Sequence, residues 1–86
     1  MNETVCIVED DANISEIESF ALKSAGLNPF AFETGKELFE SIRVKKPSLI
    51  ILDIMLPEED GIEILKKLKT SFDYSSIPVI MVSAKS

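Results

Sequence analysis

The chain has 86 residues, enough for one domain, and 45% of them are hydrophobic and 28% charged, which is an ordinary globular composition. Its net charge of −6 argues against direct binding of nucleic acid or of an anionic membrane, because both need clustered positive charge. One cysteine and no histidine exclude an internal disulfide, the usual zinc ligands, and catalysis by serine–histidine or cysteine–histidine pairs.

The N-terminal part of the chain predicts a strand, a helix and a second strand. Residues 4–8 form a continuous apolar run, which is typical of a strand that is buried on both faces. Residues 13–25 have helical spacing, and Gly26 follows where a helix C-terminal cap belongs. The predicted apolar face of this helix consists of Ile14, Ile17, Ala21 and Ala25. Pro29 places the strand around residues 30–32 at an edge of the sheet, where a missing N–H is tolerated.

The middle of the chain predicts a second helix and a third strand. Thr34 and Glu37 form a capping box that marks the start of the helix, and Pro47 stops it. The helix is predicted to bury Leu38, Phe39 and Ile42 and to have a basic last turn with Arg43, Lys45 and Lys46. The next strand, residues 49–52, is apolar throughout and ends at Asp53.

A third helix and a fourth strand complete the pattern. The loop of residues 55–61 leads into a helix whose predicted apolar face consists of Ile64, Leu65 and Leu68. Pro78 opens the apolar run of residues 79–82, which ends at Ser83. Apolar strands that alternate with helices predict an α/β fold with a parallel sheet covered on both faces. Right-handed crossovers then put the first helix on one face and the other two on the opposite face.

Reactive side chains follow three of the four predicted strands. Glu9 and Asp10 follow the first strand, Asp53 the third and Ser83 the fourth. With strand order 2-1-3-4, strands one and three are neighbours at the point where ligands bind in such sheets. Converging carboxylates repel one another unless a cation joins them, and Mg²⁺ prefers oxygen ligands. Each acid can also be a simple helix N-cap, and we interpret Asp11 as such a cap or as a solvated acid near the first helix.

The chain resembles the receiver domain of two-component response regulators in three segments: CIVEDDANI, LIILDIMLPEEDGIEIL and IPVIMVSAKS. They have the order and spacing of that family over residues 1–86. The resemblance implies a flavodoxin-like sheet of order 2-1-3-4 and a cytoplasmic phosphorelay protein that accepts a phosphoryl group from a sensor histidine kinase. The LDIMLP segment is most similar to receivers of winged-helix transcription factors, which implies transcription regulation through an effector domain outside the chain.

The resemblance assigns a role to each acid at the strand ends. Asp53 matches the phosphoacceptor, whose carboxylate attacks the phosphorus of the kinase phosphohistidine. Asp10 matches the direct Mg²⁺ ligand, and Glu9 matches the acid that acts on the metal through a water. The backbone carbonyl of Met55 matches the family's main-chain metal ligand.

Other positions match the parts of the family site that bind the phosphoryl group and shape the loop. Ser83 matches the hydroxyl that binds a phosphoryl oxygen, and the backbone N–H of Ala84 matches a second donor. Pro57 and Gly61 match the turn after the acceptor.

The chain departs from the family pattern at its C-terminal end. The family has a fifth strand, two more helices and a lysine after the fifth strand, and Lys85 is too close to Ser83 to match that lysine. We therefore expect a receiver domain that is incomplete at its C-terminus. Without these parts, the strand of residues 79–82 is an open edge beside an uncovered apolar face, so we expect self-association or a need for the absent segment.

Two alternatives remain open at this stage. The first is an inert or binding-only receiver fragment that has lost phosphotransfer together with the lysine. The second is a Mg²⁺-dependent phosphatase with an Asp nucleophile, a class that has a second Asp where this chain has Met55. We do not expect the chain to be a conventional enzyme if it is a receiver domain or a fragment of one. The apolar runs are too short to span a bilayer, so no membrane partner is expected.

Overall fold

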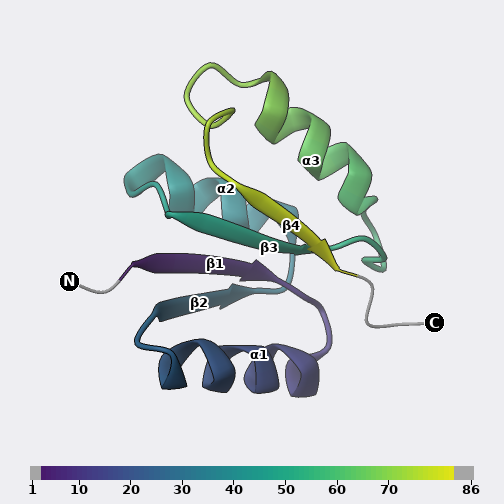
Figure 1. Cartoon of the computed structure of the whole chain (residues 1–86). Coiled ribbons are helices and arrows are strands. Elements are labelled where there is room, and N and C mark those ends of the chain that lie inside the picture. Colours follow the sequence, from purple (N-terminus) through teal and green to yellow (C-terminus); the bar gives the residue numbers. More distant parts are fainter. Residues whose placement is uncertain (1–2, 83–86) are drawn as a thin grey trace.

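The computed structural model describes residues 3–82 and contains one four-stranded sheet and three helices (Figure 1). The elements in chain order are β1 (Thr4–Val8), α1 (Ala12–Ser24), β2 (Asn28–Phe32), α2 (Gly35–Val44), β3 (Leu49–Asp53), α3 (Gly61–Thr70) and β4 (Val79–Val82). All strand pairs are parallel and their order is β2-β1-β3-β4, which confirms the predicted topology and the edge position of β2.

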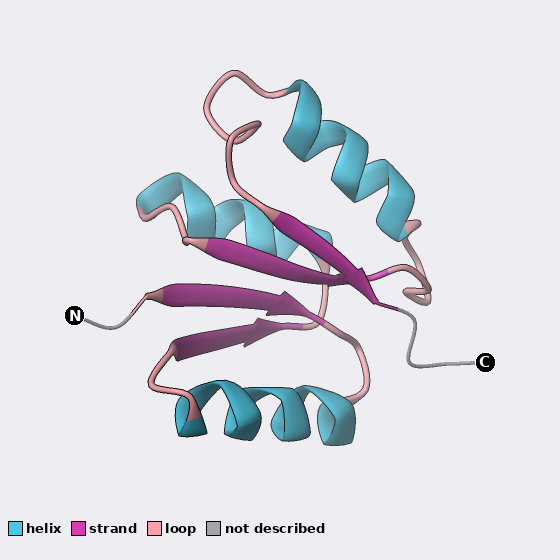
Figure 2. Ribbon diagram, viewed as in Figure 1, coloured by secondary structure: helices cyan, strands magenta, loops and turns pink. Residues whose placement is uncertain are grey.

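Helices cover both faces of the sheet, with α1 on one side and α2 and α3 on the other (Figure 2). The main core lies under α2 and α3, where these helices bury their apolar stripes against one face of the central strands. Its members include Cys6 and Val8 of β1, Ile50 and Leu52 of β3, Leu38 and Ile42 of α2, and Ile64 and Leu68 of α3. This core holds the C-terminal ends of β1 and β3 side by side.

The single cysteine is a buried core residue. Cys6 is only 2% exposed, and burial raises the pKa of its thiol to about 11. The thiol therefore stays protonated at neutral pH and behaves as a small core side chain.

Helix caps agree with the sequence at three helix starts or ends. The Asp11 side chain accepts the backbone N–H groups of Asn13 and Ile14, which confirms its role as the N-cap of α1. The Thr34 hydroxyl accepts the N–H of Glu37 at the start of α2. Gly26 follows α1 with a φ of +87°, a conformation that glycine adopts without strain.

Two local predictions were wrong. Helix α1 does not bury the predicted stripe, because Ile17, Ala21 and Ala25 are exposed. Its half-buried positions include Ile14, Glu18 and Leu22, at the four-residue spacing of one helix face. Helix α2 ends at Val44 with Lys45 as an extended C-cap, so Lys45 and Lys46 lie beyond the last turn.

The side of the sheet that carries α1 is partly open in the described part of the chain. Ile17 is 70% exposed on α1 and Ile80 is 48% exposed on β4. These side chains are apolar surface of the kind that the sequence prediction of self-association invokes. Association itself stays a prediction. None of the helices within residues 3–82 has the length and the apolar composition that a membrane-spanning helix requires.

Candidate functional site

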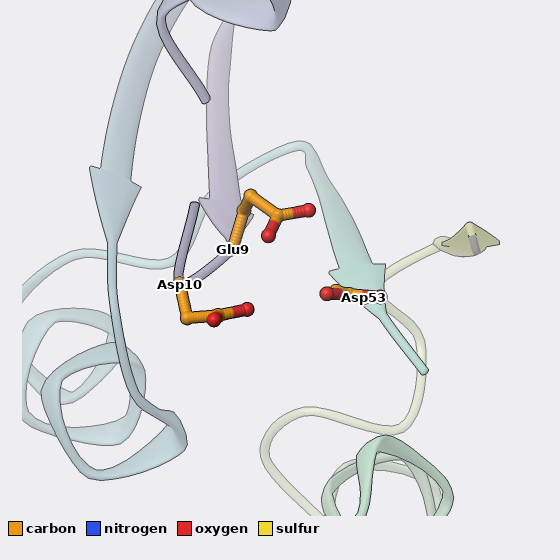
Figure 3. Close-up of side chains that lie close together, drawn as sticks. All are labelled: Glu9, Asp10 and Asp53. Atoms are coloured by element: carbon orange, nitrogen blue, oxygen red, sulfur yellow. The ribbon is translucent and has the colours of Figure 1, made fainter. Parts of the chain in front are cut away.

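Three carboxylates meet at the C-terminal edge of the sheet, between β1 and β3. Val8 of β1 pairs with Leu52 of β3, so Glu9 and Asp53, the next residues, lie at the same level on adjacent strands. One carboxylate oxygen from each of Glu9, Asp10 and Asp53 lies within 4.8 Å of the others. Figure 3 shows Asp10 and Asp53 pointing toward one another, with Glu9 beside them. The convergence predicted from the strand order is thus present.

Burial and hydrogen bonds fix two of these three side chains. Asp53 is 0% exposed, and the backbone N–H of Met55 donates to its Oδ1 over 3.1 Å. Glu9 is 2% exposed, and the backbone N–H of Asp11 donates to its Oε2 over 2.9 Å. Asp10 is half-buried. The carboxylates of Glu9 and Asp53 therefore have defined orientations before any ligand arrives.

The donor set fits a hard divalent cation. All three groups offer carboxylate oxygens, and among the described residues neither a nitrogen nor a sulfur ligand belongs to the cluster. Such a set favours Mg²⁺ or Ca²⁺ over softer metals. Two of the acids are almost fully buried, and their mutual repulsion favours a cation among them.

The loop between β3 and α3 makes a tight turn directly after Asp53. Met55 and Asp60 form an isolated antiparallel bridge, and the N–H of Gly61 donates to the Ile54 carbonyl over 3.0 Å. Asp60 is the N-cap of α3 and accepts the N–H of Ile62. Met55 itself is exposed. The loop therefore turns sharply within a few residues and directs α3 back over the sheet.

A cavity of about 180 Å³ adjoins the carboxylate cluster. It is lined by Asp10 from the β1–α1 loop, by Glu33 and Thr34 from the β2–α2 loop, and by residues 56–59 of the β3–α3 loop. Three loops thus surround a small opening next to Asp10. The cavity is large enough for several water molecules or a small anion with its metal.

A fourth acid, Glu18, affects this site and was missed from the sequence. Burial and the negative charge of Asp53 raise the pKa of the Glu18 carboxyl above its ordinary value. No hydrogen bond from the described residues reaches its buried Oε1. Glu18 lies four residues after Ile14, so the helical spacing could have placed it on the sheet-facing side of α1.

We expect Glu18→Gln to raise the melting temperature at neutral pH in the absence of divalent cations. A raised pKa means that the folded state binds this proton more tightly than the unfolded state. The ionised Glu18 therefore lowers the free energy of unfolding. This loss of stability is complete at pH values above the folded-state pKa and disappears below the unfolded-state pKa, which is about 4.3 for glutamate. The gain over the native chain should therefore shrink as the pH falls toward about 4. Thermal melts of both proteins across this range measure it, with Glu16→Gln at an exposed position of α1 as the control.

Two predicted site residues, Ser83 and Ala84, lie outside the described residues. β4 reaches Val82, whose carbonyl accepts the N–H of Ile54 at 2.9 Å. The end of β4 is therefore adjacent to the loop that follows Asp53.

Comparisons with known proteins agree on one family. The family described as the response regulator receiver domain matches residues 5–86. The alkaline phosphatase synthesis transcriptional regulatory protein PhoP of Bacillus subtilis is 33% identical over 85 residues, which are 99% of this chain and 35% of that protein. The phosphate regulon transcriptional regulatory protein PhoB of Pseudomonas aeruginosa is 39% identical, over 99% of this chain and 37% of its own length.

Solved structures show the same relationship. The N-terminal domain of a response regulator receiver protein from Methanoculleus marisnigri superposes with a TM-score of 0.90 at 34% identity, over 96% of this chain and 68% of that one. The signal receiver domain of a signal transduction histidine kinase from Syntrophus aciditrophicus superposes with a TM-score of 0.90 at 31% identity. The match covers 98% of this chain and 64% of that one. The chain spans about a third of the length of the curated relatives it matches.

Proposed function

Since the chain belongs to the receiver domain family of two-component response regulators, we propose that it accepts a phosphoryl group on Asp53 from a sensor histidine kinase. The observation that carries this proposal is the convergence of Glu9, Asp10 and Asp53 within 4.8 Å at the C-terminal edge of the sheet. The buried Asp53 carboxylate accepts the Met55 N–H and is thereby positioned as a nucleophile. The neighbouring carboxylates of Glu9 and Asp10 are suited to bind a cation beside it.

The transfer exchanges one bond to phosphorus for another. A carboxylate oxygen of Asp53 forms the new P–O bond while the P–N bond to the kinase histidine breaks, and the imidazole leaves with a proton from solvent. Little covalent chemistry is required of the protein beyond positioning the carboxylate and the incoming phosphoryl group. The cavity beside Asp10 gives that group access from solvent.

Mg²⁺ is the proposed cofactor, held by Asp10 and Asp53 directly, by Glu9 through a water and by the Met55 carbonyl. When bound, it supplies positive charge that offsets the negative charge of the carboxylates and of the phosphoryl oxygens. The all-oxygen donor set of the cluster supports this assignment.

The wider context of the site is also a proposal. We assign the Ser83 hydroxyl and the Ala84 N–H to the phosphoryl oxygens. An effector domain outside the chain is proposed to receive the signal and to regulate transcription in the cytoplasm, because PhoP and PhoB are transcriptional regulatory proteins. In this proposal the 86 residues are a receiver domain that needs further C-terminal structure for its output.

The test is phosphotransfer in vitro. The chain is incubated with a phosphorylated histidine kinase or with acetyl phosphate, with Mg²⁺ or with EDTA, and the adduct is located by peptide mass spectrometry. We expect a phosphoryl group that is labile to base and to hydroxylamine on the peptide that contains Asp53, formed only with Mg²⁺. No adduct under any of these conditions, with a complete receiver labelled in parallel, would favour the binding-only alternative.

We expect Mg²⁺ to stabilise the fold, because it binds the folded carboxylate cluster and not the unfolded chain. At about ten times its dissociation constant the gain is about 1.4 kcal/mol, which corresponds to a melting temperature higher by about 6–11 °C in a domain of this size. Differential scanning calorimetry measures it, with KCl at equal ionic strength as a control for screening. Asp10→Asn should lose most of the shift, and an unchanged melting temperature in the native chain would refute the metal site.

A further inference from the structure

The carboxylate of Glu59 joins the β3–α3 loop to the start of α2. The backbone N–H of Gly35, the first residue of α2, donates to Glu59 Oε1 with an N to O distance of 2.7 Å. The two residues are 24 positions apart, and the bond is partly buried. A first-turn N–H has no partner within its own helix, and an ionised carboxylate is a strong acceptor at the positive end of a helix.

Gly35 packs closely against this contact. A Cβ atom at position 35 would lie 2.7 Å from Glu59 Oε2 and 2.7 Å from Ile64 Cδ1, so the ends of both side chains would have to shift to admit it. Thr34 caps α2 through the N–H of Glu37 and leaves the N–H of Gly35 to Glu59. The contact is therefore specific to Glu59 and is not a general attraction between an acid and a helix end.

The bond adjoins the cavity beside Asp10. Thr34 and residues 56–59 line this cavity, so the bond from Gly35 to Glu59 joins two of the segments that enclose it. The same loop begins with Met55, whose N–H orients the Asp53 carboxylate, and the Met55–Asp60 bridge closes it into one unit. A displacement of Glu59 therefore moves the loop that holds Asp53.

We propose that Glu59 is a positioning residue for phosphoryl transfer, which acts by fixing the β3–α3 loop against α2 through the N–H of Gly35. This inference rests on the proposed function for its catalytic consequence, and on the hydrogen bond alone for its structural part. Glu59 acts through the loop and the Met55 N–H, without touching the phosphoryl group or the metal.

The test compares Glu59→Ala, Glu59→Gln and Glu58→Ala. Glu58 lines the same cavity but is exposed, so its substitution removes the same charge without removing the contact. We expect Glu59→Ala to lower the rate of Asp53 labelling by acetyl phosphate about tenfold, as misplacement of a reacting group does. Glu59→Gln retains an acceptor oxygen and should restore most of the rate, and the rate of Glu58→Ala measures the effect of the lost negative charge alone.

A second measurement separates the inference from the proposed function. Hydrogen exchange of the Gly35 and Met55 amides, followed by NMR, should accelerate in Glu59→Ala and not in Glu58→Ala. If the native chain takes no phosphoryl group, the proposed function fails, and these amides alone decide whether Glu59 holds the loop. Unchanged amide exchange in Glu59→Ala overturns the inference, as does equal loss of labelling in Glu58→Ala and Glu59→Ala.

Discussion

Asp53→Asn is expected to abolish phosphoryl labelling, with a fall in rate of at least about 10³-fold, because the amide cannot act as the nucleophile. The substitution preserves the shape of a side chain that is 0% exposed, and the amide oxygen can still accept the N–H of Met55. The variant should therefore fold and lose the reaction alone. Intact-protein mass spectrometry after treatment with acetyl phosphate and Mg²⁺ measures the adduct.

A matched control is available in the same region. Asp11→Asn makes the same chemical change two residues after Glu9, and asparagine remains a good N-cap for α1. This variant should label at the native rate. A phosphoryl adduct that persists in Asp53→Asn would show that another residue is the acceptor, and peptide mapping would identify it.

The positions of the site residues at the ends of β1 and β3 were predictable from the sequence, because a few physical rules determine where parallel strands end. Apolar runs at residues 4–8 and 79–82 became β1 and β4 with the same bounds. Parallel strands end at one edge of the sheet, so residues just after β1 and at the end of β3 had to meet once the strand order was known. The meeting of Glu9, Asp10 and Asp53 required no knowledge of side-chain detail.

Contacts that depend on the packing of a loop or of a helix face were not predictable in this way. The apolar side chain of Ile17 favours the buried stripe of α1, yet Glu18 occupies the half-buried position. Helix α1 has 13 residues and none of them is fully buried, so its apolar periodicity is weak. Rotating the helix about its axis by one residue would therefore change its buried area only a little. The Gly35–Glu59 bond joins the start of α2 to the β3–α3 loop, 24 residues apart, and sequence spacing carries no signal for such a contact.

Gly61→Ala is expected to destabilise the protein and to disturb the site. A Cβ atom at position 61 would collide with the Asp53 carbonyl oxygen and would lie 2.8 Å from Ile54 Cα, both backbone atoms that cannot rotate away. The loop or α3 must shift, at a cost of about 1–3 kcal/mol that is typical of overpacking. Each kcal/mol lowers the melting temperature by about 4–8 °C in a domain of this size. Thermal melts measure the loss of stability.

The effect on the site is separated from the effect on stability by Gly26→Ala. Gly26 has a φ of +87°, but a Cβ atom at this position would meet no other atom within 4 Å. Alanine there therefore costs about 1 kcal/mol of backbone strain, far from Asp53. At a temperature where both variants are fully folded, Gly26→Ala should label at the native rate. Gly61→Ala should label more slowly, because the shift at the Asp53 carbonyl moves the carboxylate from its place beside Asp10. Equal labelling rates in the two variants would mean that the loop absorbs the added methyl group without moving the acceptor.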